Sequence, residues 1–295
     1  MITRRDALFG LGAAGLMTGI PKANAQIRQE TRINLDLQID VSGSIKPYNY
    51  ELQFLGHATA LETLANDIED NGPIGISASV YNSSATPVLP WTLMQNAGDV
   101  LMVSGQLRKF YQERAASYSD SGSNGTRIDL SLEDSLRKHL SSPFQAWRRV
   151  TDISSNDENA ATTSYDTEKK KIVTTAQSQA HANAFRQRVI RASANAALRG
   201  GIQTNALALA FTQVKDQTKP RAGCYEFMST SVNTPEGIKF EPEDGSFPRF
   251  VEPGFTEYVA APDDMLAFVT ALRKKLVKEL LIGEARPMSA LPEYG

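Results

Sequence analysis

The stretch "INLDLQIDVSGSIKPY", residues 33–48, decides the fold of this chain. Its first half alternates apolar and polar residues, a pattern that predicts a β-strand. Asp40 closes this strand, Ser42 and Ser44 follow on alternate residues, and Pro47 suits the first turn of a helix. A strand, a short polar loop and a helix in this order favour an α/β fold, in which such loops form binding sites at the carboxyl ends of the strands.

Further strands and helices alternate along the chain. Strands are expected at 33–40, 74–82, 85–94, 148–154, 202–211 and 255–261. Helices are expected at 50–68, from Asn96 or Asp99 to about 111, from 128 onward, from about 174 to 198, and at 265–281. This order predicts a doubly wound, mostly parallel sheet with helices on both faces, and the hairpin 74–94 adds one antiparallel edge strand. We expect a single domain over 32–282, with insertions at about 155–200 and 215–254, and a loose tail at 283–295.

Residues 1–25 have the pattern of a secretory signal peptide. Arg4 and Arg5 precede an uncharged run, and Ala23-Asn24-Ala25 forms a small-x-small cleavage pattern. The paired arginines also resemble the twin-arginine export signal, with a general secretory signal as the alternative. Either route predicts a periplasmic or secreted protein.

Charge and composition exclude several classes of partner. Removal of residues 1–25 takes away Arg4, Arg5, Lys22 and Asp6, which moves the formal charge from −2 to −4. A chain without a basic surplus gives no sign of binding nucleic acid. No later stretch is apolar for long enough to predict a transmembrane helix in the mature chain. The single cysteine, Cys224, excludes an internal disulfide and a cysteine zinc site.

The loop after the first strand holds candidate metal ligands. Asp40, Ser42 and Ser44 supply one carboxylate and two hydroxyl groups at alternate positions. These hard oxygen donors suit Mg²⁺, with Mn²⁺ or Ca²⁺ as alternatives, rather than zinc or copper. The other interpretation of this spacing is an ordinary polar turn.

The motif "DVSGSI" resembles the metal-ion-dependent adhesion site (MIDAS) of the von Willebrand factor type A (vWA) domain. "NGTRIDLSLEDSL", residues 124–136, is similar to the segment of that family in which a threonine, here Thr126, is a further ligand. "RRVTDIS" and "FVTALRKKLVKELL" are similar to landmarks of a group of exported bacterial vWA proteins of unknown function. The resemblance covers most of residues 32–282 and implies the doubly wound fold.

The fifth ligand of the family is an aspartate just after the fourth main strand, and here the chain departs from the pattern. Asn156 aligns with that position and Asp157 follows it, while Asp152 lies earlier on the strand. Either Asn156, through its side-chain oxygen, or Asp157 could complete the site. The glycine that the family has next is missing.

The resemblance implies a binding module rather than an enzyme. A metal on these ligands keeps an open position that the carboxylate of a protein partner can fill. The alternatives are a structural vWA domain with a degenerate metal site and a metal-assisted hydrolase. A hydrolase is disfavoured because the chain has no G-x-S-x-G motif and its three histidines lie far apart.

One face of the first strand is unusually polar. Asn34, Asp36 and Gln38 share this face, although the central strands of parallel sheets are usually apolar on both faces. A buried Asp36 without a partner would be costly. We therefore expect either thin cover over this face or polar partners from an insertion.

Overall fold

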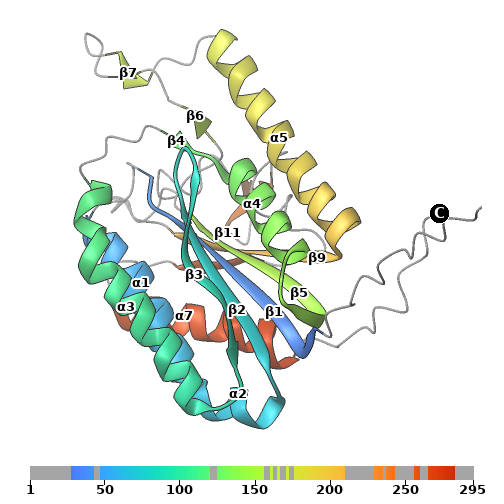
Figure 1. Cartoon of the computed structure of the whole chain (residues 1–295). Coiled ribbons are helices and arrows are strands. Elements are labelled where there is room, and N and C mark those ends of the chain that lie inside the picture. The colour runs from blue at the N-terminus through green and yellow to red at the C-terminus, as the bar shows by residue number, and fades with distance from the viewer. Residues whose placement is uncertain are drawn as a thin grey trace, which may run out of the picture.

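A six-stranded sheet with helices on both faces forms the domain (Figure 1). The computed structural model describes residues 28–42, 47–119, 125–155, 160–161, 165–166, 171–172, 176–209, 229–234, 237–242, 256–259 and 265–282. The strand order is β12-β9-β5-β1-β2-β3. All neighbouring pairs are parallel except β2 and β3, so the predicted fold class and the antiparallel edge strand are confirmed.

The strands of the sheet follow the predicted order along the chain. Their bounds are β1 Gln29–Asp40, β2 Ile74–Tyr81, β3 Ala85–Met94, β5 Phe144–Ser155, β9 Ile202–Leu209 and β12 Thr256–Val259. Strand β5 is longer than the expected 148–154 because it pairs with β1 from Gln29 to Ile39. A two-residue strand, β4 (Gly125–Thr126), pairs with β6 (Ala160–Ala161) outside the main sheet. Two further small pairs are β7 (Tyr165–Asp166) with β8 (Lys171–Ile172) and β10 (Ser229–Thr234) with β11 (Gly237–Pro242).

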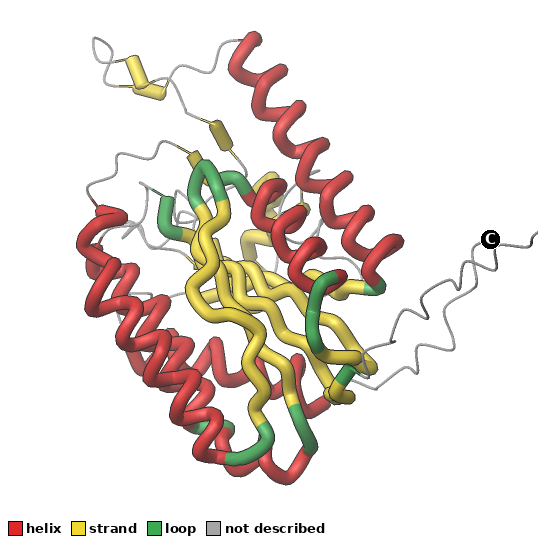
Figure 2. Tube along the Cα trace, in the orientation of Figure 1, coloured by secondary structure: helices red, strands yellow, loops and turns green. Residues whose placement is uncertain are grey.

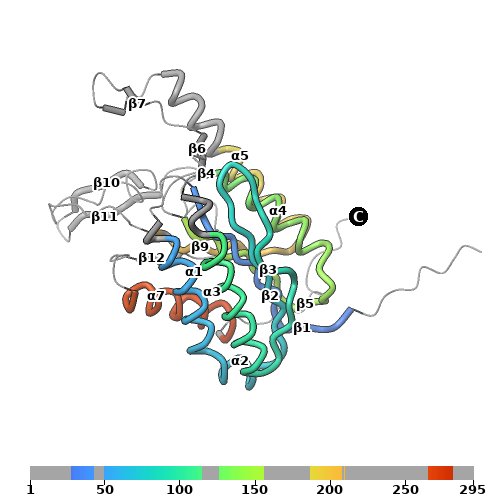
Figure 3. The backbone as a smooth tube through the Cα atoms, turned by 60° about the vertical axis from the view of Figure 1, so that its left-hand side comes forward, coloured from blue at the N-terminus to red at the C-terminus, as the bar shows by residue number. Residues whose placement is uncertain are grey.

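Helices α1, α3 and α7 cover one face of the sheet, and α4 and α5 cover the other (Figures 2 and 3). Their bounds are α1 Pro47–Glu62, α2 Ala65–Asn71, α3 Ala97–Ser119, α4 Ile128–Leu140, α5 Ala176–Gly200 and α7 Met265–Val277, which continues as a π-helix over Lys278–Ile282. Helix α5 ends where Gly200-Gly201 predicts, because Gly201 adopts a φ of 59° that favours glycine.

The helix expected at 50–68 is two helices. Thr63 donates its hydroxyl hydrogen to the carbonyl of Ala60 at 2.7 Å, and the Leu64 N–H bonds to the carbonyl of Leu61 at 2.9 Å. The Leu64 N–H thus bonds three residues back instead of four, and this tighter turn separates α1 from α2. Leu61 and Leu64 still lie in the same buried core.

Apolar side chains fill the space between the sheet and the α1, α3 and α7 layer. Leu35 and Leu37 of β1 point into this core, together with Leu52 of α1 and Phe268 of α7. Helices α1 and α7 approach closely at Gly56, where an added Cβ atom would lie 2.3 Å from the ring of Phe268. The opposite face of β1 carries the polar residues, and it packs against α4.

Candidate metal centre

Asp40 is the last residue of β1, and its carboxylate is completely buried. The backbone N–H of Ser42 donates to Oδ1 of Asp40 at 2.8 Å. The hydroxyl of Ser155, at the end of the neighbouring strand β5, donates to Oδ2 at 2.6 Å. Both carboxylate oxygens are therefore held in place by groups from two different segments.

Helix α1 holds the start of the loop after β1. The hydroxyl of Tyr50 lies 3.2 Å from the carbonyl oxygen of Val41 and 3.1 Å from that of Ser42. Burial and the charge of Asp40 raise the pKa of Tyr50 to about 12, so the phenol keeps its donor hydrogen at neutral pH. Gln53 donates to the carbonyl of Asp40 at 2.9 Å. The backbone from Asp40 to Ser42 is thus held in place by the helix that follows the loop.

Thr126 reaches the same end of the sheet through β2. The N–H of Val41 bonds to the carbonyl of Tyr81 at 2.8 Å, and the N–H of Arg127 bonds to the carbonyl of Asn82 at the same distance. The loop after β1 and the segment of Thr126 therefore attach to consecutive residues at the carboxyl end of β2. Thr126 is buried, as Asp40 and Ser42 are.

Three of the predicted ligands, Ser44, Asn156 and Asp157, lie outside the described residues. The described residues on either side of Asn156 and Asp157 are Ser155, which bonds to Asp40, and Ala160, which pairs with Thr126. Both flanks of this segment thus contact residues of the candidate site.

Asp152 has a different role from that of a metal ligand. It lies on the opposite face of β5, where its carboxylate is 2.5 Å from the ammonium of Lys275 on α7. The same ammonium lies 2.5 Å from Glu279, which also accepts a hydrogen bond from Asn205 at 2.8 Å. All of these side chains are completely buried or nearly so. They join α7 and the π-helix after it to the sheet.

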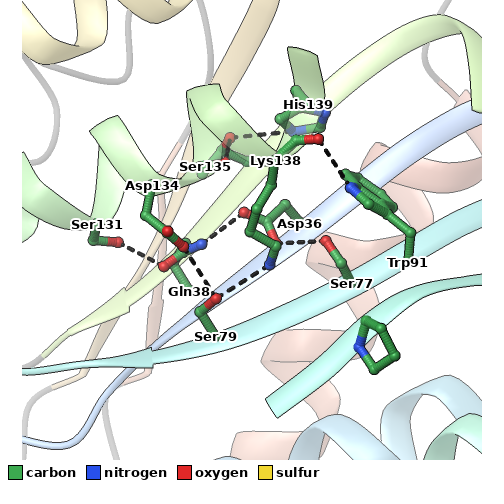
Figure 4. A network of polar contacts seen from close by, with 12 residues as sticks. Asp36, Gln38, Ser77, Ser79, Trp91, Ser131, Asp134, Ser135, Lys138 and His139 are labelled. Atoms are coloured by element: carbon green, nitrogen blue, oxygen red, sulfur yellow. Dashed lines mark hydrogen bonds and ion pairs between the residues drawn. The ribbon is translucent and has the colours of Figure 1, made fainter. Parts of the chain in front are cut away.

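Helix α4, which begins two residues after Thr126, is fixed to the sheet by polar contacts (Figure 4). Lys138 of α4 forms an ion pair with Asp36 of β1, and Ser77 of β2 donates to the same carboxylate at 2.6 Å. Gln38 donates to Asp36 at 2.6 Å and accepts from Ser131 of α4 at 3.0 Å. The polar face of β1 thus finds its partners in α4 and β2, not in an insertion.

Electrostatics keep Asp36 ionised in this network. Burial alone would raise its pKa, but the charge of Lys138 and the hydrogen bonds from Lys138 and Ser77 bring the pKa below its ordinary value. His139, next to Lys138, is completely buried, and burial lowers its pKa to about 4. The ring of Trp91 lies 5.2 Å from that of His139 and donates its N–H to the carbonyl of Lys138 at 3.0 Å. The network therefore holds one buried ion pair and a neutral histidine.

The donor set of the candidate site fits a hard cation. Its described members are the carboxylate of Asp40 and the hydroxyls of Ser42 and Thr126, which are oxygen donors of the kind that Mg²⁺ prefers. Within the described part of the chain, no three His, Cys, Asp or Glu side chains gather as a metal site. Likewise, none of the described helices combines the length and the apolar character that a membrane crossing requires.

The sequence alone did not predict that Ser155 of β5 and Tyr50 and Gln53 of α1 would contact Asp40 and the residues after it. In the parallel pair of β1 and β5, Ile39 pairs with Ser154, so the next residues, Asp40 and Ser155, lie side by side. Because parallel strands end at the same edge, a hydroxyl at the end of β5 could have been recognised as a neighbour of Asp40. Tyr50 and Gln53 gave no such signal, since their positions depend on the packing of α1.

Comparisons with known proteins agree with this architecture. The family described as "Protein of unknown function (DUF1194)" matches residues 30–185. A comparison with curated proteins found no match. Among solved structures, a mutant of the PilB minor pilin from Streptococcus sanguinis is 13% identical with a TM-score of 0.50, covering 86% of this chain and 63% of that one.

Two further structures have lower TM-scores. BatB from Bacteroides thetaiotaomicron is 14% identical with a TM-score of 0.44, covering 82% of this chain and 99% of that one. The von Willebrand factor type A protein from Catenulispora acidiphila is 13% identical with a TM-score of 0.44, covering 85% of this chain and 43% of that one. At such identities these likenesses concern the fold alone.

Proposed function

The chain belongs to the DUF1194 family and has a vWA-like fold, and we propose that it is a divalent-metal-dependent protein-binding module. One observation carries this proposal. The segments of Asp40, Ser42 and Thr126 meet at the carboxyl end of the sheet through β2, and all three residues are buried. This is the edge at which open α/β sheets bind their ligands.

The residues that would hold the cation are Asp40, Ser42, Ser44 and Thr126, with Asn156 or Asp157 as the fifth. Mg²⁺ is the best candidate, with Mn²⁺ and Ca²⁺ as alternatives, because every proposed donor is an oxygen atom. When bound, the cation would offer an open coordination position to a carboxylate of a partner protein. Tyr50 and Gln53 hold the backbone of Asp40, Val41 and Ser42 in place, which lowers the entropic cost of ordering these residues on binding.

An exported location belongs to the same proposal. Residues 1–25 have the pattern of a signal peptide, and the periplasm or the cell exterior would be the place where the partner is met. One of the similar structures is a minor pilin, which supports such a role. We expect no hydrolase activity, because both histidines whose side chains the structure describes, His57 and His139, are buried and engaged in the interior.

A structural vWA domain without a metal is the second candidate. The observation that favours it is that Ser42 and Ser155 already donate to the two oxygens of Asp40. A carboxylate oxygen accepts more than one bond, so these contacts are also compatible with a cation. The two candidates therefore differ in metal affinity and not in the fold.

Calorimetric titration of the full chain with Mg²⁺ and with Mn²⁺ tests the proposal. We expect saturable binding by the wild type and loss of binding in Asp40→Ala, because Asp40 is the one carboxylate among the described donors. Asp70→Ala is the matched control, since Asp70 is an exposed aspartate of α2. The absence of binding in the wild type, or equal binding in Asp40→Ala, would contradict the metal-dependent function.

A further inference from the structure

We propose that Ser155 is a positioning residue of the metal centre: its hydroxyl orients the Asp40 carboxylate toward the cation. This inference rests on the proposed function and adds to it a residue that the DxSxS and threonine motifs do not contain. Strands β1 and β5 are parallel, and Ile39 pairs with Ser154, so Ser155 lies beside Asp40 at the end of the sheet. Both side chains are completely buried.

The contact determines how the carboxylate is turned. The hydroxyl of Ser155 donates to Oδ2 at 2.6 Å, and the backbone N–H of Ser42 donates to Oδ1 at 2.8 Å. Two donors on two different oxygens fix the rotation of the carboxylate about its last torsion angle. A carboxylate oxygen accepts more than one bond, so these two contacts are compatible with a role of Asp40 as a metal ligand. A short bond between a hydroxyl and an ionised carboxylate is also one of the stronger hydrogen bonds in proteins.

Loss of a hydrogen-bond donor to a metal ligand lowers metal affinity by a known factor. Removal of a hydrogen-bond donor to a metal-ligating carboxylate typically weakens metal binding by about 10- to 100-fold. A hydroxyl that served the fold alone would instead lower the stability of the metal-free chain and leave the affinity of the folded protein unchanged. The two roles are therefore distinguishable by measuring affinity and stability separately.

The neighbouring residue offers a matched control. Ser154 differs from Ser155 by one position, is equally buried, and points to the opposite face of β5. Its hydroxyl donates to Oε1 of Gln53 at 2.7 Å and not to Asp40. Removal of its hydroxyl costs one buried hydrogen bond, to a neutral amide, and leaves both donors to the Asp40 carboxylate in place.

The experiment is a Mn²⁺ titration of the full chain, followed by calorimetry and by the electron paramagnetic resonance signal of free Mn²⁺. Ser155→Ala should bind Mn²⁺ about 10-fold or more weakly, since the orienting donor is gone. Ser155→Thr, which keeps the hydroxyl, and Ser154→Ala should both stay within about 3-fold of the wild type. Chemical unfolding of each metal-free variant measures its stability in parallel.

Wild-type affinity in Ser155→Ala, together with loss of binding in Asp40→Ala, would overturn the role of Ser155 and leave the proposed function intact. Unchanged binding in Asp40→Ala would instead overturn the metal centre itself. If Ser155→Ala does not fold, Ser155→Cys takes its place, because a thiol is of similar size and only a weak donor. Wild-type affinity in that variant would equally refute the inference.

Discussion

Replacement of Lys275 by methionine should destabilise the domain strongly. The ammonium of Lys275 is completely buried and lies 2.5 Å from the carboxylates of both Asp152 and Glu279. Burial would lower the pKa of Lys275, but the two carboxylates raise it above its ordinary value, so the side chain is a cation. Methionine preserves much of the volume and removes the charge that both acids face.

The size of the loss in stability follows from the two buried carboxylates, Asp152 and Glu279, that keep no cation beside them in the variant. Removal of one partner of a buried ion pair costs about 3–5 kcal/mol, because the remaining charge is uncompensated. A typical domain is stable by about 5–15 kcal/mol, so this loss is a large fraction of the total. Lowering the pH should reduce the loss, because burial and Asp152 raise the pKa of Glu279 to about 7 and its protonation removes one of the two stranded charges.

Urea unfolding followed by circular dichroism at pH 8 measures this effect. Lys274→Met is the matched control, since Lys274 is the adjacent lysine of α7 and is exposed. We expect the control to stay within about 0.5 kcal/mol of the wild type. A loss of less than about 1 kcal/mol in Lys275→Met, with an unchanged urea dependence, would refute the assignment of the cluster as a buried charge-balanced unit.

Further predictions concern pH, the polar network and helix packing. Burial and the neighbouring carboxylate of Asp152 raise the pKa of Glu279 from its ordinary value of 4.5 to about 7. Between pH 4.5 and pH 7, Glu279 is therefore protonated in the folded state and ionised in the unfolded chain. The contribution of Glu279 to the free energy of unfolding of the wild type should therefore fall by up to about 3 kcal/mol as the pH rises from 4.5 to 7. Urea titrations of Glu279→Gln between pH 4.5 and pH 7 should lack this fall. Lys138→Met should cost about 3 kcal/mol in the free energy of unfolding because Asp36 loses its cation, and a cost near zero would contradict the ion pair. Gly56→Ala should lower the free energy of unfolding by about 1–3 kcal/mol in urea titrations, because its Cβ would meet the aromatic ring of Phe268 on α7. Gly105→Ala, at an exposed helical position with nothing within 4 Å of its Cβ, should instead raise stability by about 0.5–1 kcal/mol, and the same sign in both glycine variants would count against this reasoning.

The alternation of apolar and polar residues over 33–40 predicted the central strand β1 and the character of both its faces. It predicted a strand with one apolar and one polar face, and β1 has Leu35 and Leu37 in the main core and Asp36 and Gln38 against α4. Periodicity works here because the side chains of a strand point alternately to its two sides. The same pattern could not say which element would supply partners for the polar face.

Other predictions remain untested by the structure. The signal peptide, the tail at 283–295, Ser44, Asn156, Asp157 and Cys224 lie outside the described residues. The apolar spacing predicted one continuous helix over 50–68, which is wrong at the junction of α1 and α2, where the Leu64 N–H bonds three residues back instead of four. The spacing of apolar residues indicates which side of a helix is buried, and it does not detect a single tighter turn of the backbone.

The sequence by itself determined the order of strands and helices, the antiparallel edge and the placement of Asp40 at the end of its strand with Ser42 in the loop that follows. These features depend on residues that are close along the chain. Only the tertiary structure decided that Ser155 bonds to Asp40, that Lys138 pairs with Asp36 and that Lys275 joins two acids. Those contacts link residues far apart in sequence, and their partners are selected by strand register and helix packing, which bring the side chains together where burial makes an unpaired charge too costly to leave.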